Sequence, residues 1–206
     1  MTDRQHAHPE QGKEQGKEQG TAPGSAPDRE PGKEPGKELA KLPCLGPASA
    51  MVDTLYGMIG QSKFFEDFTL DDVRKLSQFM TVYRADPGDT IIREGATDDY
   101  MLFILEGRIN IVKTDAHGER HPMTSVGPGA TLGEMSMIDG EPRFATCIAL
   151  DATTFSVFAR NSMVRIIMEE PQLGAKVLIK LVTLLSQRLR DTSSSLLHYL
   201  ERTESV

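Results

Sequence analysis

The stretch from residue 132 to residue 146 reads Leu-Gly-Glu-Met-Ser-Met-Ile-Asp-Gly-Glu-Pro-Arg-Phe-Ala-Thr. Gly133, which follows Gly129, indicates a backbone that turns sharply and presents amide N–H groups. A short helical turn over residues 135–138 would direct the positive end of its dipole at an anion. Arg143 is the one basic side chain of the stretch, and a guanidinium can hold a phosphate through a rigid bidentate fork. The stretch therefore predicts an anion site at a turn.

Glu134 lies nine residues before Arg143 and adds a second chemical element. An ionised carboxylate only accepts hydrogen bonds, which suits a sugar hydroxyl. A phosphate and a ribose hydroxyl on one small ligand indicate a nucleotide. Taken alone, however, a Gly-Glu pair is most often a turn, and an arginine beside a glutamate is most often a salt bridge. The rest of the sequence is therefore needed to distinguish a nucleotide site from an ordinary turn with a salt bridge.

Those surrounding residues predict many short strands. Turn signals occur at Pro87-Gly88-Asp89, Glu94-Gly95, Glu106-Gly107, Asp115–Gly118 and Pro128-Gly129. Between and after them, segments rich in β-branched and aromatic residues run over 90–93, 100–105, 108–113 and 146–159. Turns every 8–12 residues or so are typical of a β-barrel or a β-sandwich.

Helices are predicted on both sides of the strands. The apolar rhythm favours helices over 49–60 and over 70–80, the second with a capping-box start at Thr69 and Asp72. Asn161 caps a short helix that ends at residue 168, and Pro171 begins a longer one. Along the longer helix, apolar residues recur in heptad steps, which favours a partner helix over packing within the chain. This seam consists of Leu178, Val182, Leu185, Leu189, Thr192, Leu196 and Tyr199.

The first 46 residues differ in composition from the rest of the chain. They hold a near-repeat of Gly-Lys-Glu, and their acidic and basic residues nearly cancel. A segment with so little apolar surface cannot offset its chain entropy, so we expect residues 1–46 to form a disordered tail and residues 47–206 to form one domain. The net charge of −7 without a basic patch disfavours nucleic acid. Two distant cysteines and the absence of a signal or membrane segment predict a reducing cytoplasm.

The order of these parts resembles the cyclic-nucleotide-binding domain family of catabolite activator proteins, kinase regulatory subunits and nucleotide-gated channels. Two motifs carry the resemblance over about residues 64–199. The first is Pro87-Gly88-Asp89-x-Ile91-x-x-Glu94-Gly95 followed by Ile104-x-x-Gly107, and the second is Gly133-Glu134-x-Ser136 followed by Pro142-Arg143-x-Ala145-Thr146. The resemblance implies a mainly β fold with flanking α: a double-stranded β-helix (jelly-roll) barrel with N-terminal helices and a long C-terminal helix.

The same resemblance implies roles for individual residues. Arg143 would hold the cyclic phosphate and Glu134 the ribose 2′-hydroxyl. The other expected ligand-binding residues are Gly133, Met135, Ser136, Phe144, Ala145, Thr192 and Ser193, the last two as contacts to the base. Position 144 is usually small in the family, so Phe144 could stack on a purine, narrow the pocket or point into the core. Ser136 replaces a common alanine and could add a hydroxyl contact.

We therefore expect a regulatory sensor that binds cAMP or cGMP and signals through a protein partner or through a homodimer formed by the C-terminal helix. A nucleophile–base pair, a metal-ligand spacing and a phosphate-binding loop of the P-loop type are absent from the sequence, so no catalysis, metal or cofactor is expected. Two alternatives stay open. One is a catabolite-activator-type transcriptional regulator, which is disfavoured because only residues 201–206 would follow the long helix. The other is a degenerate domain that acts as an interaction scaffold.

Overall fold

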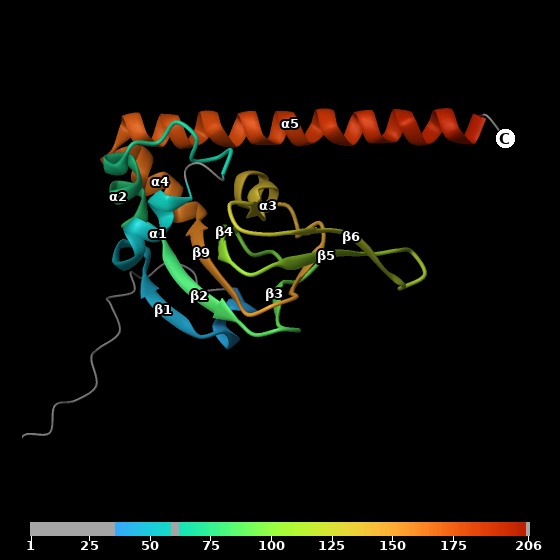
Figure 1. The fold of residues 1–206 in the computed structure, drawn as a ribbon, viewed down its shortest axis with the longest axis horizontal. Coiled ribbons are helices and arrows are strands. Elements are labelled where there is room, and N and C mark those ends of the chain that lie inside the picture. The colour runs from blue at the N-terminus through green and yellow to red at the C-terminus, as the bar shows by residue number, and fades with distance from the viewer. Residues whose placement is uncertain (1–35, 59–61, 205–206) are drawn as a thin grey trace, which may run out of the picture. The chain divides into compact units, whose positions relative to one another are not determined.

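The computed structural model describes residues 36–58 and 62–204 of the chain. The prediction of a disordered tail therefore falls largely outside the described residues. Figure 1 shows the described elements: a β-barrel with short helices at one end and the long helix α5 alongside it.

The folded part begins before the predicted boundary at residue 47. A 3-10 turn, Leu39–Lys41, and the strand β1, Cys44–Pro47, come first. β1 pairs antiparallel with β2, Thr81–Ala85. The Leu39 side chain is 2% exposed and belongs to the core cluster of the barrel. The boundary is therefore corrected for residues 36–46, because one buried leucine and one paired strand anchor a segment whose composition is polar.

The N-terminal helices follow the predicted order but are shorter. A 3-10 turn, Ala48–Met51, leads into α1, Val52–Gly57, and α2 covers Leu70–Ser77. Thr69 and Asp72 form the predicted capping box: the Thr69 hydroxyl accepts the Asp72 N–H, and the Asp72 carboxylate accepts the Thr69 N–H. Lys176 of the long helix also donates to Asp72 at 2.7 Å, so this cap ties α2 to the C-terminal part of the chain.

Two antiparallel sheets form the predicted jelly-roll barrel. One sheet has the order β1-β2-β9-β4-β7 and the other β3-β8-β5-β6. The predicted run over residues 146–159 is two strands, because the chain leaves one sheet at residue 150 and enters the other at residue 153. The remaining strands are β3 (Thr90–Ile92), β4 (Tyr100–Glu106), β5 (Ile109–Thr114), β6 (Arg120–Val126), β7 (Thr131–Leu132), β8 (Thr146–Ala149) and β9 (Thr153–Ala159).

The strand β4 separates two hydrophobic cores, which explains its unbroken apolar sequence. Successive side chains of a strand point to opposite faces of the sheet. Met101, Phe103 and Leu105 belong to the cluster beneath the helices. Tyr100, Leu102 and Ile104 belong to the cluster inside the barrel. A strand buried on both faces reads as continuous hydrophobic sequence rather than as an alternation.

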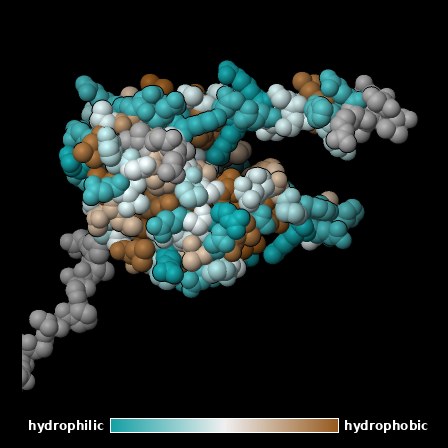
Figure 2. Space-filling view, viewed as in Figure 1, coloured by the Kyte–Doolittle hydropathy of each residue, from teal (hydrophilic) through white to brown (hydrophobic). Residues whose placement is uncertain are grey.

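The C-terminal part consists of α4, Arg160–Glu169, and α5, Pro171–Glu204. Leu173, Val177 and Leu181 are the α5 side chains that are buried against the domain. Most of the predicted seam lies on another face of the helix: Leu185 is half-buried, and the other seam residues are exposed, namely Leu178, Val182, Leu189, Thr192, Leu196 and Tyr199. Figure 2 shows hydrophobic side chains at the surface of this helix among hydrophilic ones. Within the described residues, none of the helices is both long and apolar enough to cross a membrane.

Candidate functional site

The site forms where the chain leaves β7 at a left-handed glycine. Gly133 has φ = +82° and precedes α3, Glu134–Asp139. A Cβ atom at this position would lie 2.5 Å from Arg143 Nη1 and 2.9 Å from the Tyr100 carbonyl oxygen. Both the backbone conformation and the close approach of the arginine therefore require glycine. Glu134 begins this helical turn, which the sequence placed at residues 135–138.

Arg143 is buried at this turn, and its side chain is incompletely paired. The residue is 3% exposed, and its Nη1 donates to the Gly133 carbonyl at 3.0 Å. Its guanidinium carbon lies 4.3 Å from the centre of the Tyr100 ring. The Nε and Nη2 groups have no hydrogen-bond partner among the described residues. Burial lowers the pKa of Arg143, as expected for a cation removed from water before an anion is bound.

The backbone of Arg143 is fixed by the loop that follows β3. The Arg143 N–H donates to the Ala96 carbonyl at 2.8 Å, and the Arg143 carbonyl accepts the Gly95 N–H at 2.8 Å. The predicted motif that ends at Gly95 and the predicted motif around Arg143 are therefore joined directly. This pairing fixes the Arg143 backbone, and the hydrogen bond from Nη1 to the Gly133 carbonyl orients the guanidinium.

Glu134 has a partner, Arg188, that is not among the residues predicted for the site. Its residue exposure is 2%, and its Oε2 accepts a hydrogen bond from Arg188 Nη1 at 2.9 Å. The other oxygen, Oε1, is unpaired within the described part of the chain. Arg188 lies on α5 and also donates through Nη2 to the Thr131 carbonyl at 2.7 Å. The long helix is thus connected to the turn through one side chain.

These groups surround a cavity of about 120 Å³. Its lining includes seven of the nine predicted ligand-binding residues: Gly133, Glu134, Met135, Ser136, Arg143, Phe144 and Ala145. The lining that was not predicted consists of Arg188 and four side chains of the barrel, Ile92, Ile111, Leu132 and Cys147. The alternating sequence of β5 predicted that Ile111 lies on one face of a strand. It could not predict that Ile111 lies beside this turn, because that position depends on the pairing of Ile111 with Cys147 across β5 and β8.

Thr192 and Ser193 do not line the cavity in this single chain. Both are exposed, and the Thr192 hydroxyl donates to the Arg188 carbonyl one turn earlier at 2.8 Å. Their predicted contact with a base stays a prediction. The reason for their position is helical geometry, because they lie one turn beyond the last α5 residue that reaches the cavity.

Phe144 lies at the edge of the cavity and is 54% exposed. The interpretation in which its ring points into the core is therefore wrong. Ser136, by contrast, is buried at the start of α3. The Cys147 thiol inside the cavity is also buried, and burial raises its pKa to about 12. A thiol with such a pKa is protonated at neutral pH and is a poor nucleophile.

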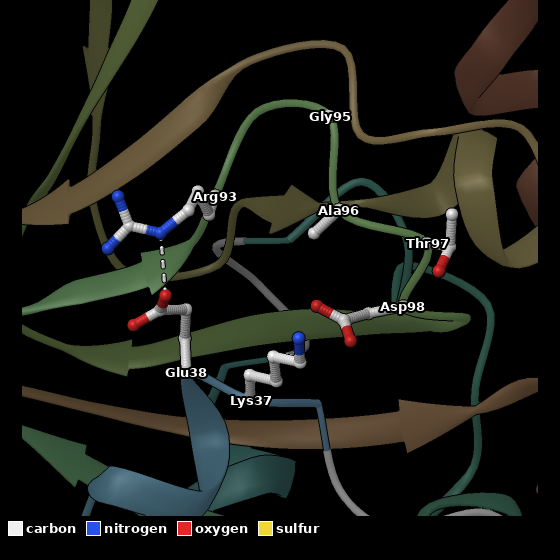
Figure 3. A pocket seen from close by; sticks show the side chains of 7 residues that line it. All are labelled: Lys37, Glu38, Arg93, Gly95, Ala96, Thr97 and Asp98. Atoms are coloured by element: carbon white, nitrogen blue, oxygen red, sulfur yellow. Dashed lines mark hydrogen bonds and ion pairs between the residues drawn. The ribbon is translucent and has the colours of Figure 1, made fainter.

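A second cavity, of about 290 Å³, is lined in part by Gly95 and Ala96 of the loop that holds Arg143. Figure 3 shows Arg93 and Glu38 joined on one side of it and Lys37 and Asp98 on the other. The Arg93 Nε–Glu38 Oε1 distance is 2.6 Å, and Lys41 also donates to Glu38. Hydrogen bonds from Arg93 and Lys41 lower the pKa of Glu38. This cavity is larger than the Arg143 cavity, but the buried Glu38 carboxylate is already paired with Arg93 and Lys41. It therefore presents fewer unpaired polar groups to a ligand than the Arg143 cavity does.

One cluster of potential metal ligands lies within the described residues: Asp115, Glu119 and His121. All three belong to the β5–β6 hairpin, where Glu119 and His121 are exposed and Asp115 is half-buried. Asp115 already accepts hydrogen bonds from the His117 and Glu119 N–H groups and lies 2.8 Å from His121 Nε2. These hydrogen bonds close the hairpin turn, which explains why the three side chains lie close together.

Fold and site together define a jelly-roll domain with a buried arginine that lines a small cavity. Residues 83–170 match the family model of the cyclic nucleotide-binding domain. A crystal structure of a cyclic nucleotide-binding domain from Methylobacillus flagellatus KT is 37% identical and superimposes with a TM-score of 0.69, covering 77% of this chain and 89% of that one. The chain belongs to the cyclic nucleotide-binding domain family.

Two curated relatives contain the domain within longer proteins. The cAMP-dependent protein kinase regulatory subunit of Mycosarcoma maydis is 28% identical over 124 residues, which is 55% of this chain and 24% of the relative. The CRP-like cAMP-activated global transcriptional regulator of Mycobacterium tuberculosis H37Rv is 26% identical over 109 residues, which is 53% of this chain and 47% of the relative. The chain thus spans less than half the length of either relative.

Proposed function

We propose that this protein is a regulatory sensor that binds a cyclic purine nucleotide, cAMP or cGMP, in the Arg143 cavity. One observation carries the proposal: two guanidinium donors of Arg143 are buried without partners among the described residues. A buried donor that is left unpaired costs about 1–3 kcal/mol, and more on a charged group. A cyclic phosphate would satisfy both donors, because a guanidinium and a phosphate pair in bidentate geometry.

Glu134 gives the proposal its second contact. Its unpaired Oε1 can accept a ribose hydroxyl, and a hydroxyl bound there would lie beside the Glu134–Arg188 pair. The pairing of Arg188 with Glu134 links the cavity to α5. We propose that ligand binding changes this contact, shifts the position of α5 and so signals to a second copy of the chain or to another protein.

Several finer points belong to the same proposal. Both curated relatives are named for cAMP, which supports cAMP as the first ligand to test. The buried arginine and glutamate retain the polar groups of a working site, which favours ligand binding over a degenerate scaffold.

We propose a regulatory role rather than catalysis, and the protonated Cys147 thiol supports it. The proposed compartment is a reducing cytoplasm, which the two free cysteines support.

A thermal-shift screen tests the proposed function. cAMP or cGMP is expected to raise the melting temperature, and at a free concentration one hundred times the Kd the gain corresponds to about 2.7 kcal/mol. Adenosine is the matched control ligand, because it lacks the phosphate that Arg143 would bind and should give little or no shift. An equal shift with adenosine, or none with cAMP and cGMP, would refute the proposal.

The left-handed glycine of the site provides a second test. Gly133→Ala is expected to destabilise the protein by at least about 1–2 kcal/mol, since an L-residue at positive φ costs that much. It should also weaken cAMP binding at least about tenfold, because the new Cβ would displace the Arg143 donors. Urea denaturation and calorimetric titration measure the two effects.

Gly118→Ala is the matched control for this variant. Gly118 has φ = +85°, but a Cβ there would meet no atom within 4 Å. The control should therefore lose similar backbone stability and keep its affinity for cAMP. An equal loss of affinity in both variants would show that strain alone, and not the displacement of Arg143, affects binding.

A further inference from the structure

Phe144 is an exposed aromatic residue that also borders the candidate site. Its residue is 54% exposed, and it also lines the Arg143 cavity. It follows Arg143 directly in the sequence, so the two Cα atoms are about 3.8 Å apart. Both residues line this cavity, so an apolar ring borders the same space as the two guanidinium donors that lack partners among the described residues.

Lys113 of β5 holds Phe144 in two ways. Its ammonium nitrogen lies 4.3 Å from the centre of the Phe144 ring and donates to the Phe144 carbonyl at 2.6 Å. A cation over an aromatic face is an attractive contact, worth about 0.5–1 kcal/mol at exposed sites. The ring is thus oriented from one face, while more than half of the residue stays accessible to solvent.

Glu94 in turn orients Lys113. The Lys113 nitrogen lies 2.7 Å from Glu94 Oε1, and Glu94 Oε2 accepts the Thr114 N–H at 2.9 Å. The Glu94 N–H donates to the Thr146 hydroxyl at 3.1 Å, on the strand that follows the site. Glu94 is therefore held by β5 and β8, and through Glu94 these strands fix the position of Lys113 and of the Phe144 ring. Such preorganisation of an exposed apolar group lowers the cost of placing a flat ligand against it.

We propose that Phe144 is the base platform of this domain: its ring stacks on the nucleobase of the nucleotide whose phosphate Arg143 holds, and it selects purines over pyrimidines. The inference rests on the proposed function and goes beyond it by assigning the base preference to one side chain. Stacking on an aromatic ring favours the larger purine surface. The ring has no hydrogen-bonding group, so it gives little discrimination between adenine and guanine.

Calorimetric titration of cAMP, cGMP and the pyrimidine nucleotide cUMP tests this inference. For Phe144→Ser we expect affinities for cAMP and cGMP to fall about tenfold, and the affinity for cUMP to fall by less than about threefold. Phe144→Tyr should keep wild-type affinities, because it retains the ring. Both variants change an exposed side chain, and their melting temperatures without ligand verify that they fold. Met123→Ser replaces an exposed apolar residue of β6 outside the cavity and should leave all three affinities unchanged.

Each other result has a definite meaning. Tighter cAMP binding by Phe144→Ser would show that the ring narrows the cavity, and equal losses for cAMP and cUMP would show that it does not recognise the base; either overturns the platform while the proposed function stands. Binding of cAMP by Phe144→Ser but not by the wild type would show that the ring blocks the cavity, which also overturns the platform. Absence of binding of all three nucleotides to the wild type and the variants would overturn both proposals.

Discussion

Replacement of Arg143 by methionine is expected to abolish nucleotide binding without destabilising the ligand-free protein. Arg143 is 3% exposed, and two donor groups of its guanidinium have no partner among the residues that the structure describes. A methionine of similar length removes this desolvated charge together with its buried unpaired donors, which cost about 1–3 kcal/mol or more in the ligand-free protein. The same change removes the only basic group that we assign to the phosphate, so the Kd for cAMP should rise at least about 100-fold.

Titration calorimetry with cAMP and urea denaturation without ligand measure the two halves of this prediction. Arg108→Met is the control, because Arg108 forms an exposed ion pair with Asp151 at 2.7 Å. Exposed pairs contribute about 0–1 kcal/mol, so this variant should lose little stability and no affinity. A large loss of stability in Arg143→Met would instead identify Arg143 as a structural residue, and unchanged binding would remove it from the site.

The second large expected effect concerns the oligomeric state, which we attribute to the exposed seam of α5. We expect the wild type to form a dimer with twice the chain mass of 22.7 kDa. The combined substitution Val182→Glu and Leu189→Glu should return it to the mass of one chain. Both side chains are exposed in the single chain, so the change should leave the fold intact. Burying like charges against each other at a helix seam opposes association.

Light scattering during size-exclusion chromatography measures these masses. Ser194→Glu adds a charge to an exposed position of the same helix outside the heptad seam, and it should remain dimeric. A wild type with the mass of one chain, both with and without cAMP, would contradict the proposed dimer. A dimer that persists in the double variant would place the interface on another surface.

Much of the fold could be predicted because its signals are local. The capping box of α2, the glycine turns between strands and the proline at the start of α5 each depend on a few neighbouring residues. Residues 36–46 could not be assigned in this way. Their order depends on the burial of Leu39 in a core whose other members lie far along the chain, and composition does not reveal such a contact.

The candidate site likewise contains residues that could be predicted from local sequence and one that could not. The residues within 133–145 could be predicted together, because they are close in sequence and their pattern resembles that of a family. Arg188 could not, since its contact with Glu134 spans 54 positions and depends on how α5 lies against the barrel. The sequence also left three orientations open for Phe144, and the structure excludes the one in the core.

Titration of the unmodified protein with cAMP decides whether the Arg143 cavity binds a cyclic nucleotide. We expect saturable binding of one nucleotide per chain, competition by cGMP for the same cavity, and loss of the signal in Arg143→Met. Absence of measurable binding to the folded wild type at millimolar cAMP or cGMP, or full binding by Arg143→Met, would refute a nucleotide site at Arg143.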